Sequence, residues 1–383
     1  MRAGARSLPI AFALVLAACA TAAPPAASGP EKVTVTATTA SELVSVMTAW
    51  QSALGKKDLT GFQATIDLSR PAFRRCQAET FDIASRQGFT PSEVKIPKVE
   101  PYLDVYMRAY VGDDVNGYSR VYFRREAGKW IRSEPLDTEL GGDRTKTVDG
   151  LQLSYYGIDD DVIDEYAASG NDVRAFLLQQ AAGHTATGQA FGLRIFPTRG
   201  AAGPNVACGV AGFHLTNTPN DPFIRLFSNA LSFKAGLSSV TETTASIIRH
   251  EGLHWLQDQF IPGITARMPF WLVEGWPDFI GQSRSLAVKK NVVCNTPTPT
   301  YKQLEDGADP NGPPELSPQY YSFANSMVEY LYTNFGGADA YRKLLLGYKD
   351  SAVSAVTMPK VLNITPEQFY EGWKVAAKKK FCG

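Results

Sequence analysis

The spacing of apolar residues predicts a helix followed by short strands in the first third of the chain. Within 41–57, apolar residues recur every three or four positions, as on one face of a helix, at Leu43, Val44, Met47, Trp50 and Leu54. Ser41 is the expected N-cap. Runs rich in β-branched and aromatic residues predict strands at 102–111, 119–123 and 130–133, the last two joined by a turn.

A polar stretch at 141–150 predicts a boundary, after which strands come first and helices follow. Strands are expected at 151–156, 191–196 and 206–215, and helices from about Thr241 onward, including 321–335 and 339–348. A last helix is expected to begin at Thr365, with Pro366 at its first position and Gln368 completing a capping box. Sheet first and helices afterwards is the pattern of an α+β protein.

The first helix with the sheet after it resembles small cystatin-like or NTF2-like domains. This resemblance covers about a hundred residues, carries no chemical motif and implies a fold only. We therefore expect a small α+β domain at 31–147 and a second domain at 148–383.

The first thirty residues have the features of an export signal. Arg2 and Arg6 precede an apolar run at 8–18 that is too short to span a bilayer. The run ends in Leu16-Ala17-Ala18-Cys19, which resembles the lipobox of bacterial lipoproteins. The resemblance implies removal of residues 1–18, a lipid on Cys19 that anchors the protein to a membrane, a flexible tether at 19–30, and a cell-envelope location at the outer membrane or periplasmic face rather than the inner membrane. The alternative is an ordinary secretory signal cut within 20–22.

Charge and composition exclude two classes of protein. The chain has 38 basic and 38 acidic residues with no block of lysine and arginine, so no nucleic-acid partner is expected. With 44% hydrophobic and 20% charged residues, the composition is that of a globular protein rather than a disordered one.

Four cysteines remain besides Cys19: Cys76, Cys208, Cys294 and Cys382. None of them lies near another in the sequence, as zinc-binding cysteine pairs do. An even number in an exported chain favours two disulfides, and three pairings are open.

Two of the four histidines stand in His250-Glu251-Gly252-Leu253-His254. Residues four apart on a helix are rotated by about 40° and displaced by about 6 Å, so both imidazoles project from one face and suit Zn²⁺. Glu251 lies about 100° around the helix, where its carboxylate could take a proton from a metal-bound water. A seam of Ala245, Ile248, Gly252 and Trp255 with Thr241 as N-cap supports the helix. The alternative is a structural histidine pair without metal.

The segment from Phe270 to Phe279 contains Trp271-Leu272-Val273-Glu274-Gly275. Here the chain resembles the gluzincin metallopeptidases, whose second motif is W-L-x-E-G. The resemblance implies a zincin-like domain, Glu274 as the third zinc ligand, and Asp278 as a carboxylate that orients a ligand histidine. Pro277 departs from the family pattern and leaves the position of Asp278 open. Gln257 and Phe260 stand where a metzincin needs glycine and histidine, which excludes that class.

A further similarity to these peptidases lies at Tyr321-Ser322-Phe323-Ala324. It implies that Tyr321 donates a hydrogen bond to the developing oxyanion, with Tyr320 as the neighbouring candidate. The alternative is aromatic core packing at a helix start. His184 and His214 are not expected to bind metal.

Together these features predict a lipid-anchored zinc metallopeptidase that hydrolyses peptide or protein substrates. Zn²⁺ would be held by His250, His254 and Glu274, with Glu251 as the general base. The stretch 221–239 lacks the G-x-M-E-N element of aminopeptidases, so recognition of a free N-terminus is not expected. A catalytically silent zincin-like lipoprotein that serves as a binding or assembly module is the alternative function. Oligomeric state and disulfide pairing stay open.

Overall fold

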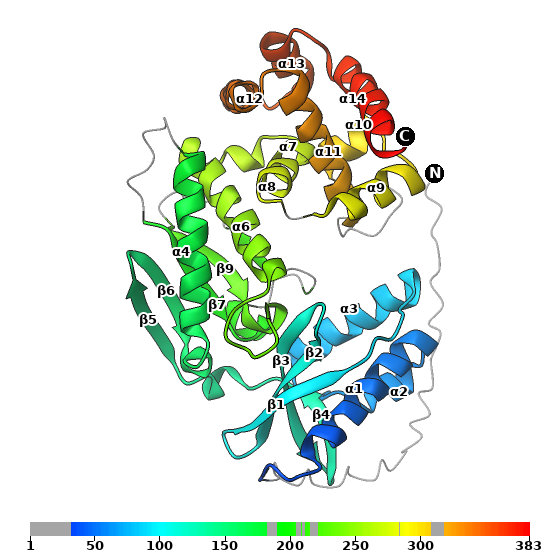
Figure 1. Ribbon diagram of the computed structural model, residues 1–383, viewed down its shortest axis with the longest axis vertical. Helices are drawn as coiled ribbons and strands as arrows, with labels where there is room; N and C mark the ends of the chain where they lie inside the picture. The colour runs from blue at the N-terminus through cyan, green and yellow to red at the C-terminus, as the bar shows by residue number, and fades with distance from the viewer. Residues whose placement is uncertain are drawn as a thin grey trace, which may run out of the picture.

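The computed structural model describes residues 32–181, 190–203, 208, 211–214, 221–282, 284–307 and 318–383. The predictions for Cys19 and His184 lie outside these residues. Helices and two five-stranded sheets make up the described chain, which confirms the α+β class. Figure 1 shows the first sheet with its helices at one end of the molecule and an all-helical part at the other.

The first part contains three helices and four strands, in the order α1 (Thr39–Lys56), α2 (Leu59–Gln63), α3 (Pro71–Gln87), β1 (Lys95–Tyr102), β2 (Tyr106–Asp113), β3 (Gly117–Glu126) and β4 (Lys129–Ser133). The prediction of Ser41 as N-cap is wrong, because α1 begins two residues earlier, after Thr38. The Thr39 hydroxyl accepts a hydrogen bond from the Thr36 amide at 2.8 Å, and this turn starts the helix ahead of Ser41.

The first sheet is antiparallel and buries both of its faces. Along β2, alternate residues point to opposite sides. Met107, Ala109 and Val111 pack under α1. Tyr106 and Tyr110 face the second part of the chain, which follows β4. The strand order is β1-β2-β3-β10, and β4 also pairs with β3. The short strand β10 (Ser232–Phe233) comes from the second part of the chain, so the two parts share this sheet.

The second sheet is mixed, with strand order β5-β6-β7-β9-β8. Its strands are β5 (Asp143–Val148), β6 (Leu151–Tyr156), β7 (Gly192–Phe196), β8 (Gly212–His214) and β9 (Phe223–Phe227). The central strands β6, β7 and β9 are parallel, and the edge strands β5 and β8 are antiparallel to their neighbours. The expected boundary at 147/148 falls at the end of β5, a strand that pairs with β6 and belongs with this sheet.

Helices α4 (Ile163–Gln180) and α6 (Glu242–Phe260) pack against each other beside the second sheet, as Figure 1 shows. The single turn α5 (Arg199–Ala202) follows β7. The described residues after α6 form α-helices and connecting turns, with no strand: α7 (Phe270–Val273), α8 (Gly275–Ile280), α9 (Leu286–Asn295), α10 (Tyr301–Asp306), α11 (Pro318–Asn334), α12 (Ala338–Asp350), α13 (Ser354–Leu362) and α14 (Pro366–Phe381). The Thr365 capping box with Pro366 at the first position is confirmed. None of the helices within the described ranges has the length and apolar character needed to cross a bilayer.

Two disulfides connect distant segments, and of the three pairings left open the structure has Cys76–Cys208 and Cys294–Cys382. The first ties α3 to the chain just before β8, and the second ties the ends of α9 and α14. Their sequence separations of 132 and 88 residues close long loops, which restricts the unfolded chain strongly.

A buried polar cluster lies where the two parts of the chain meet. The Arg120 side chain on β3 is 1% exposed and forms an ion pair with Asp159, which is fully buried. Its guanidinium also donates to the carboxylate of Asp161 at 3.3 Å and to the hydroxyl of Ser228 at 3.2 Å. A buried charge is tolerated only where it is paired and hydrogen-bonded, so this cluster holds β3 against the second part.

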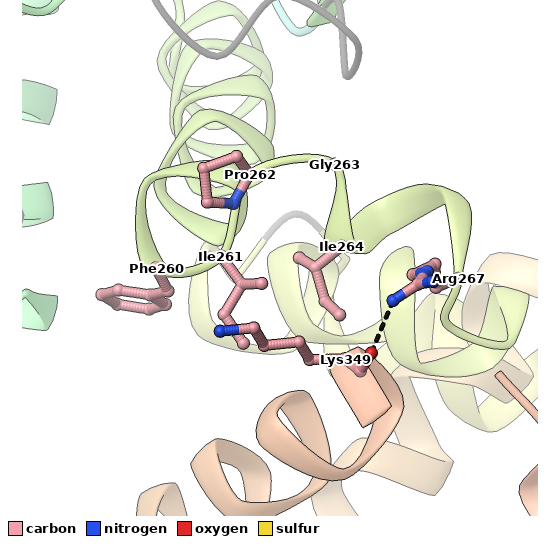
Figure 2. Close-up of a pocket in the computed structure, with 7 residues that line it drawn as sticks. All are labelled: Phe260, Ile261, Pro262, Gly263, Ile264, Arg267 and Lys349. Carbon is pink, nitrogen blue, oxygen red and sulfur yellow. Dashed lines mark hydrogen bonds between the residues drawn. The ribbon is translucent and has the colours of Figure 1, made fainter. Parts of the chain in front are cut away.

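A surface cavity of about 290 Å³ lies at the C-terminal end of α6, between Phe260, Ile264 and Lys349. Figure 2 shows that Arg267 closes one side of it by donating a hydrogen bond, Nη1 to the carbonyl of Lys349 at 2.5 Å. None of its lining residues belongs to the histidine motif, so this cavity is separate from the site described next.

Candidate metal centre

Helix α6 carries the histidine motif and is fixed at its start by the expected cap. The Thr241 side chain accepts a hydrogen bond from the Thr244 amide at 3.2 Å. Of the predicted core-facing seam, Ile248, Gly252 and Trp255 are buried and Ala245 is half-buried. A Cβ on Gly252 would lie 2.9 Å from Leu177 Cδ1 on α4. Glycine inside the motif therefore lets α4 and α6 approach closely.

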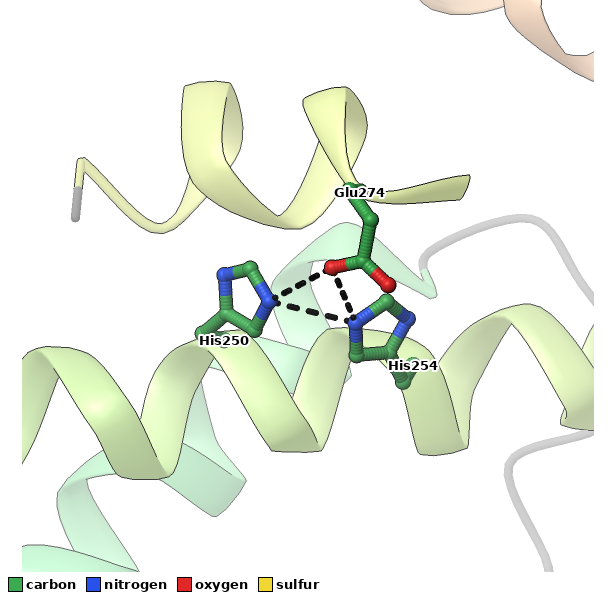
Figure 3. Close-up of side chains that lie close together, drawn as sticks. All are labelled: His250, His254 and Glu274. Carbon is green, nitrogen blue, oxygen red and sulfur yellow. Dashed lines mark hydrogen bonds and ion pairs between the residues drawn. The ribbon is translucent and has the colours of Figure 1, made fainter. Parts of the chain in front are cut away.

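Three potential ligand atoms converge on one point above α6, as Figure 3 shows: His250 Nε2, His254 Nε2 and Glu274 Oε2. The two nitrogens lie 3.1 Å apart, and each lies 3.2 Å from the carboxylate oxygen. A tetrahedral ion about 2.0–2.1 Å from its ligands holds any two of them about 3.3 Å apart. The triangle therefore fits the donor set and the dimensions of a zinc site.

Glu274 reaches this point from the junction of α7 and α8, where its own backbone stays helical. It is the one residue between the two short helices, and Gly275 follows it at the start of α8. Gly275 packs against the backbone of α11, where an added Cβ would lie 2.4 Å from the carbonyl oxygen of Ala324. Gly275 of the W-L-x-E-G segment thus lies against Ala324 of the segment that begins at Tyr321. Pro277 falls in the first turn of α8, where proline is tolerated.

Gly275→Ala is expected to destabilise the protein, because the new Cβ would collide with backbone rather than with a movable side chain. Overpacking of this kind costs about 1–3 kcal/mol of the free energy of unfolding, which thermal or urea denaturation would measure. Gly55→Ala in α1 is the matched control, since its Cβ would meet atoms no closer than 3.4 Å. Equal stability of the Gly275 variant and wild type would contradict the close approach of α8 and α11.

The outer nitrogen of His250 faces Asp278, as the family resemblance implies. Asp278 Oδ1 lies 3.6 Å from His250 Nδ1, and its side chain is 2% exposed. Arg284 donates from Nε to the other carboxylate oxygen of Asp278 at 2.6 Å. A carboxylate behind a ligand histidine fixes the orientation of the ring and makes it a stronger base.

The charged groups of the site shift one another's pKa values. Burial opposes the charged form of His250, but the neighbouring carboxylates of Asp278 and Glu274 outweigh it and raise the pKa of His250 to about 10. Burial also opposes ionisation of Glu274, yet the two histidines beside it hold its pKa well below the ordinary value. The Glu274 carboxylate is therefore ionised and the protonated form of His250 is favoured, so a divalent cation bound here would take the place of that proton.

Glu251 lies beside the convergence point, on the side of the second sheet. A Cβ on Gly212 of β8 would lie 3.1 Å from Glu251 Cγ, so the carboxylate stem packs directly on the edge strand. Burial raises the pKa of Glu251 from its ordinary value, which makes it a stronger proton acceptor when ionised.

Tyr321 also lies at this site, at the start of α11. Its ring centroid is 6.3 Å from that of His250 and 5.5 Å from that of Phe270, and the Arg284 guanidinium lies 5.1 Å from it. Burial, with Glu274 and Glu251 nearby, raises the pKa of Tyr321, so its hydroxyl keeps its proton. The neighbouring Tyr320 is 7% exposed and belongs to the hydrophobic core.

Two features of the site were missed by sequence reasoning. The amide of Gln257 contacts His254, and Arg284 contacts Asp278. Gln257 lies one turn after His254 on the same helix, a spacing that could have pointed to the contact. Nothing in the sequence around Arg284 indicates its contact with Asp278. His214 Nε2 lies 3.1 Å from Asp258 Oδ2, with both side chains 2% exposed, and is outside the triad.

Comparison with known proteins gives no identification. No protein-family model and no curated protein matches the chain. The function must therefore be argued from the site itself.

Proposed function

We propose that this protein is a zinc-dependent peptide hydrolase of the gluzincin type, with a zincin-like second part. The observation that carries the proposal is the triangle of His250 Nε2, His254 Nε2 and Glu274 Oε2, with edges of 3.1–3.2 Å. A fourth residue, Glu251, lies next to the triangle and is suited to moving a proton. The ligand side chains are 10–18% exposed, so the triangle is accessible from outside.

A zinc ion held there would act as a Lewis acid and lower the pKa of water to about 7. Glu251 accepts a proton from the attacking water and passes it to the leaving amine. Tyr321 stabilises the oxyanion of the tetrahedral intermediate by donating from its protonated hydroxyl. Asp278 keeps the His250 ring oriented, and Arg284 keeps Asp278 in place.

The edge strand β8 supports a peptide as the substrate. Among the described residues β8 pairs only with β9, which leaves its other edge without a strand partner. An extended peptide adds readily to such an edge through main-chain hydrogen bonds. Because Gly212 packs against Glu251, a peptide on this edge would pass beside the general base. Cleavage within an extended chain follows more directly from this placement than recognition of a free terminus.

We also propose that the protein acts in the cell envelope, anchored by a lipid on Cys19. Two disulfides between distant segments support an oxidising compartment.

Zinc content of the purified protein, measured by elemental mass spectrometry, tests the proposed site. We expect one zinc ion per chain in the wild type and loss of that ion in His254→Ala, because the remaining two ligands cannot complete the coordination. His214→Gln is the matched control, since His214 binds Asp258 outside the triad. Absence of zinc from the wild type after zinc is supplied would overturn the proposal.

A further inference from the structure

One buried amide connects three helical segments at and around the candidate metal centre. Gln257 on α6 is fully buried, and its Oε1 lies 2.9 Å from His254 Nδ1. Its Nε2 donates to the carbonyl oxygen of Val273 at 3.1 Å and to the hydroxyl of Tyr341 on α12 at 2.8 Å. Val273 immediately precedes Glu274, so this single side chain contacts both halves of the ligand set.

The partners of Gln257 determine which way its amide is turned. A backbone carbonyl can only accept, so the nitrogen of the amide must face Val273 and the oxygen must face His254. An oxygen at 2.9 Å from Nδ1 accepts a hydrogen bond from it, so Nδ1 must carry the proton. In a neutral imidazole the other nitrogen is then unprotonated. A metal ion binds the neutral form of histidine, and with the proton held on Nδ1 the lone pair of His254 Nε2 would then be directed at the point where the three ligand atoms meet.

Pro277 explains why the Val273 carbonyl is available to Gln257. In an α-helix the carbonyl of residue 273 would accept from the amide of residue 277. Residue 277 is a proline and has no N–H, so the Val273 carbonyl lacks its helical partner, and Gln257 Nε2 supplies one. Pro277, which departs from the family pattern, and Gln257 are thus structurally linked, because Gln257 supplies the hydrogen bond that a proline at 277 cannot donate.

We propose that Gln257 is a positioning residue that fixes the tautomer of His254 and holds the Glu274 segment at the distance a metal ion requires, with Pro277 leaving the Val273 carbonyl free for this contact. The inference rests on the proposed zinc site and adds to it a link between the two ligand-bearing segments. Gln257 contacts no substrate in this arrangement, and it acts through His254 and Val273.

The test is zinc affinity of the full chain, measured by competition with a chelator, together with the melting temperature. Gln257→Met keeps the size of the side chain and removes every hydrogen bond, and we expect zinc binding about 10–100-fold weaker. Gln257→Glu still accepts from His254 Nδ1–H but cannot donate to Val273. We expect this variant to lose less zinc affinity than Gln257→Met, because only the hold on the Glu274 segment is gone, and we expect its melting temperature to fall. Gln179→Met on the exposed face of α4 is the matched control.

The double variant Gln257→Met with Pro277→Ala separates positioning from stability. Alanine at 277 restores an N–H for the Val273 carbonyl, so we expect the melting temperature to recover in part while zinc affinity stays low. Recovery of both together would overturn the inference, because the affinity loss would then be a loss of fold. Zinc affinity of Gln257→Met within about twofold of wild type would also overturn it. A wild-type protein that binds no zinc would instead overturn the proposed function.

Discussion

Glu251→Gln is expected to lower peptide hydrolysis by about 10²–10⁴-fold, the usual contribution of a general base. The substitution keeps the size of the side chain and its packing against Gly212, but an amide cannot take a proton from water. Zinc content is expected to stay at the wild-type value, because Glu251 is not one of the three converging ligands. Initial rates on a peptide library and elemental analysis of the same preparations measure both quantities.

Glu242→Gln is the matched control, since Glu242 lies on the same helix and its side chain is 79% exposed. It should leave both rate and zinc content unchanged. Turnover of Glu251→Gln close to wild type would exclude Glu251 as the base. A wild-type protein that binds zinc but hydrolyses no peptide in the library would favour the catalytically silent binding module.

Arg120→Met is expected to lower the free energy of unfolding by about 3–5 kcal/mol, the cost of leaving a buried charge without its partner. Asp159 is fully buried, and its main partner is the guanidinium of Arg120. Methionine fills much of the same space, so the loss comes from the uncompensated carboxylate rather than from a cavity. Urea denaturation followed by tryptophan fluorescence gives the difference.

The double variant Arg120→Met with Asp159→Leu removes both charges and should recover most of the lost stability, because an apolar pair avoids the desolvation cost. If the free energy of unfolding of Arg120→Met alone lies within about 1 kcal/mol of wild type, the pair of Arg120 and Asp159 is not what holds the two parts together.

The sequence could predict the part of the site that lies on a single helix. His250 and His254 share one helix, and helix periodicity alone brings them together. Glu274 comes from another segment, and only the W-L-x-E-G motif placed it near them. The structure brings the three together as the resemblance implied, while the identity of the metal stays a prediction. Tyr321 and Asp278 also lie beside His250, while their roles stay predictions.

The features that were not predicted depend on contacts between residues far apart in the sequence. Nothing in Ser232-Phe233 indicates pairing with β3, because a two-residue strand has no periodicity. The helix begins at Thr39, ahead of the expected cap at Ser41, because a turn at Thr36–Thr39 leads directly into it. The contact between Gln257 and Val273 joins two different helices, which propensity does not specify.

The sharing of the first sheet also has a consequence for the order in which the chain folds. During synthesis β3 emerges more than a hundred residues ahead of β10, so the Tyr118–Ser119 end of β3 has no partner on that side until Phe233 has appeared. The tyrosine-bearing face packs against Leu140 and Ile158, which are synthesised well before β10, so this face can be covered earlier than the strand edge. A nascent chain in this state exposes an unpaired strand edge, which promotes aggregation. We therefore expect a fragment that ends before residue 232 to need a chaperone to stay in solution, whereas the longer chain completes its own sheet.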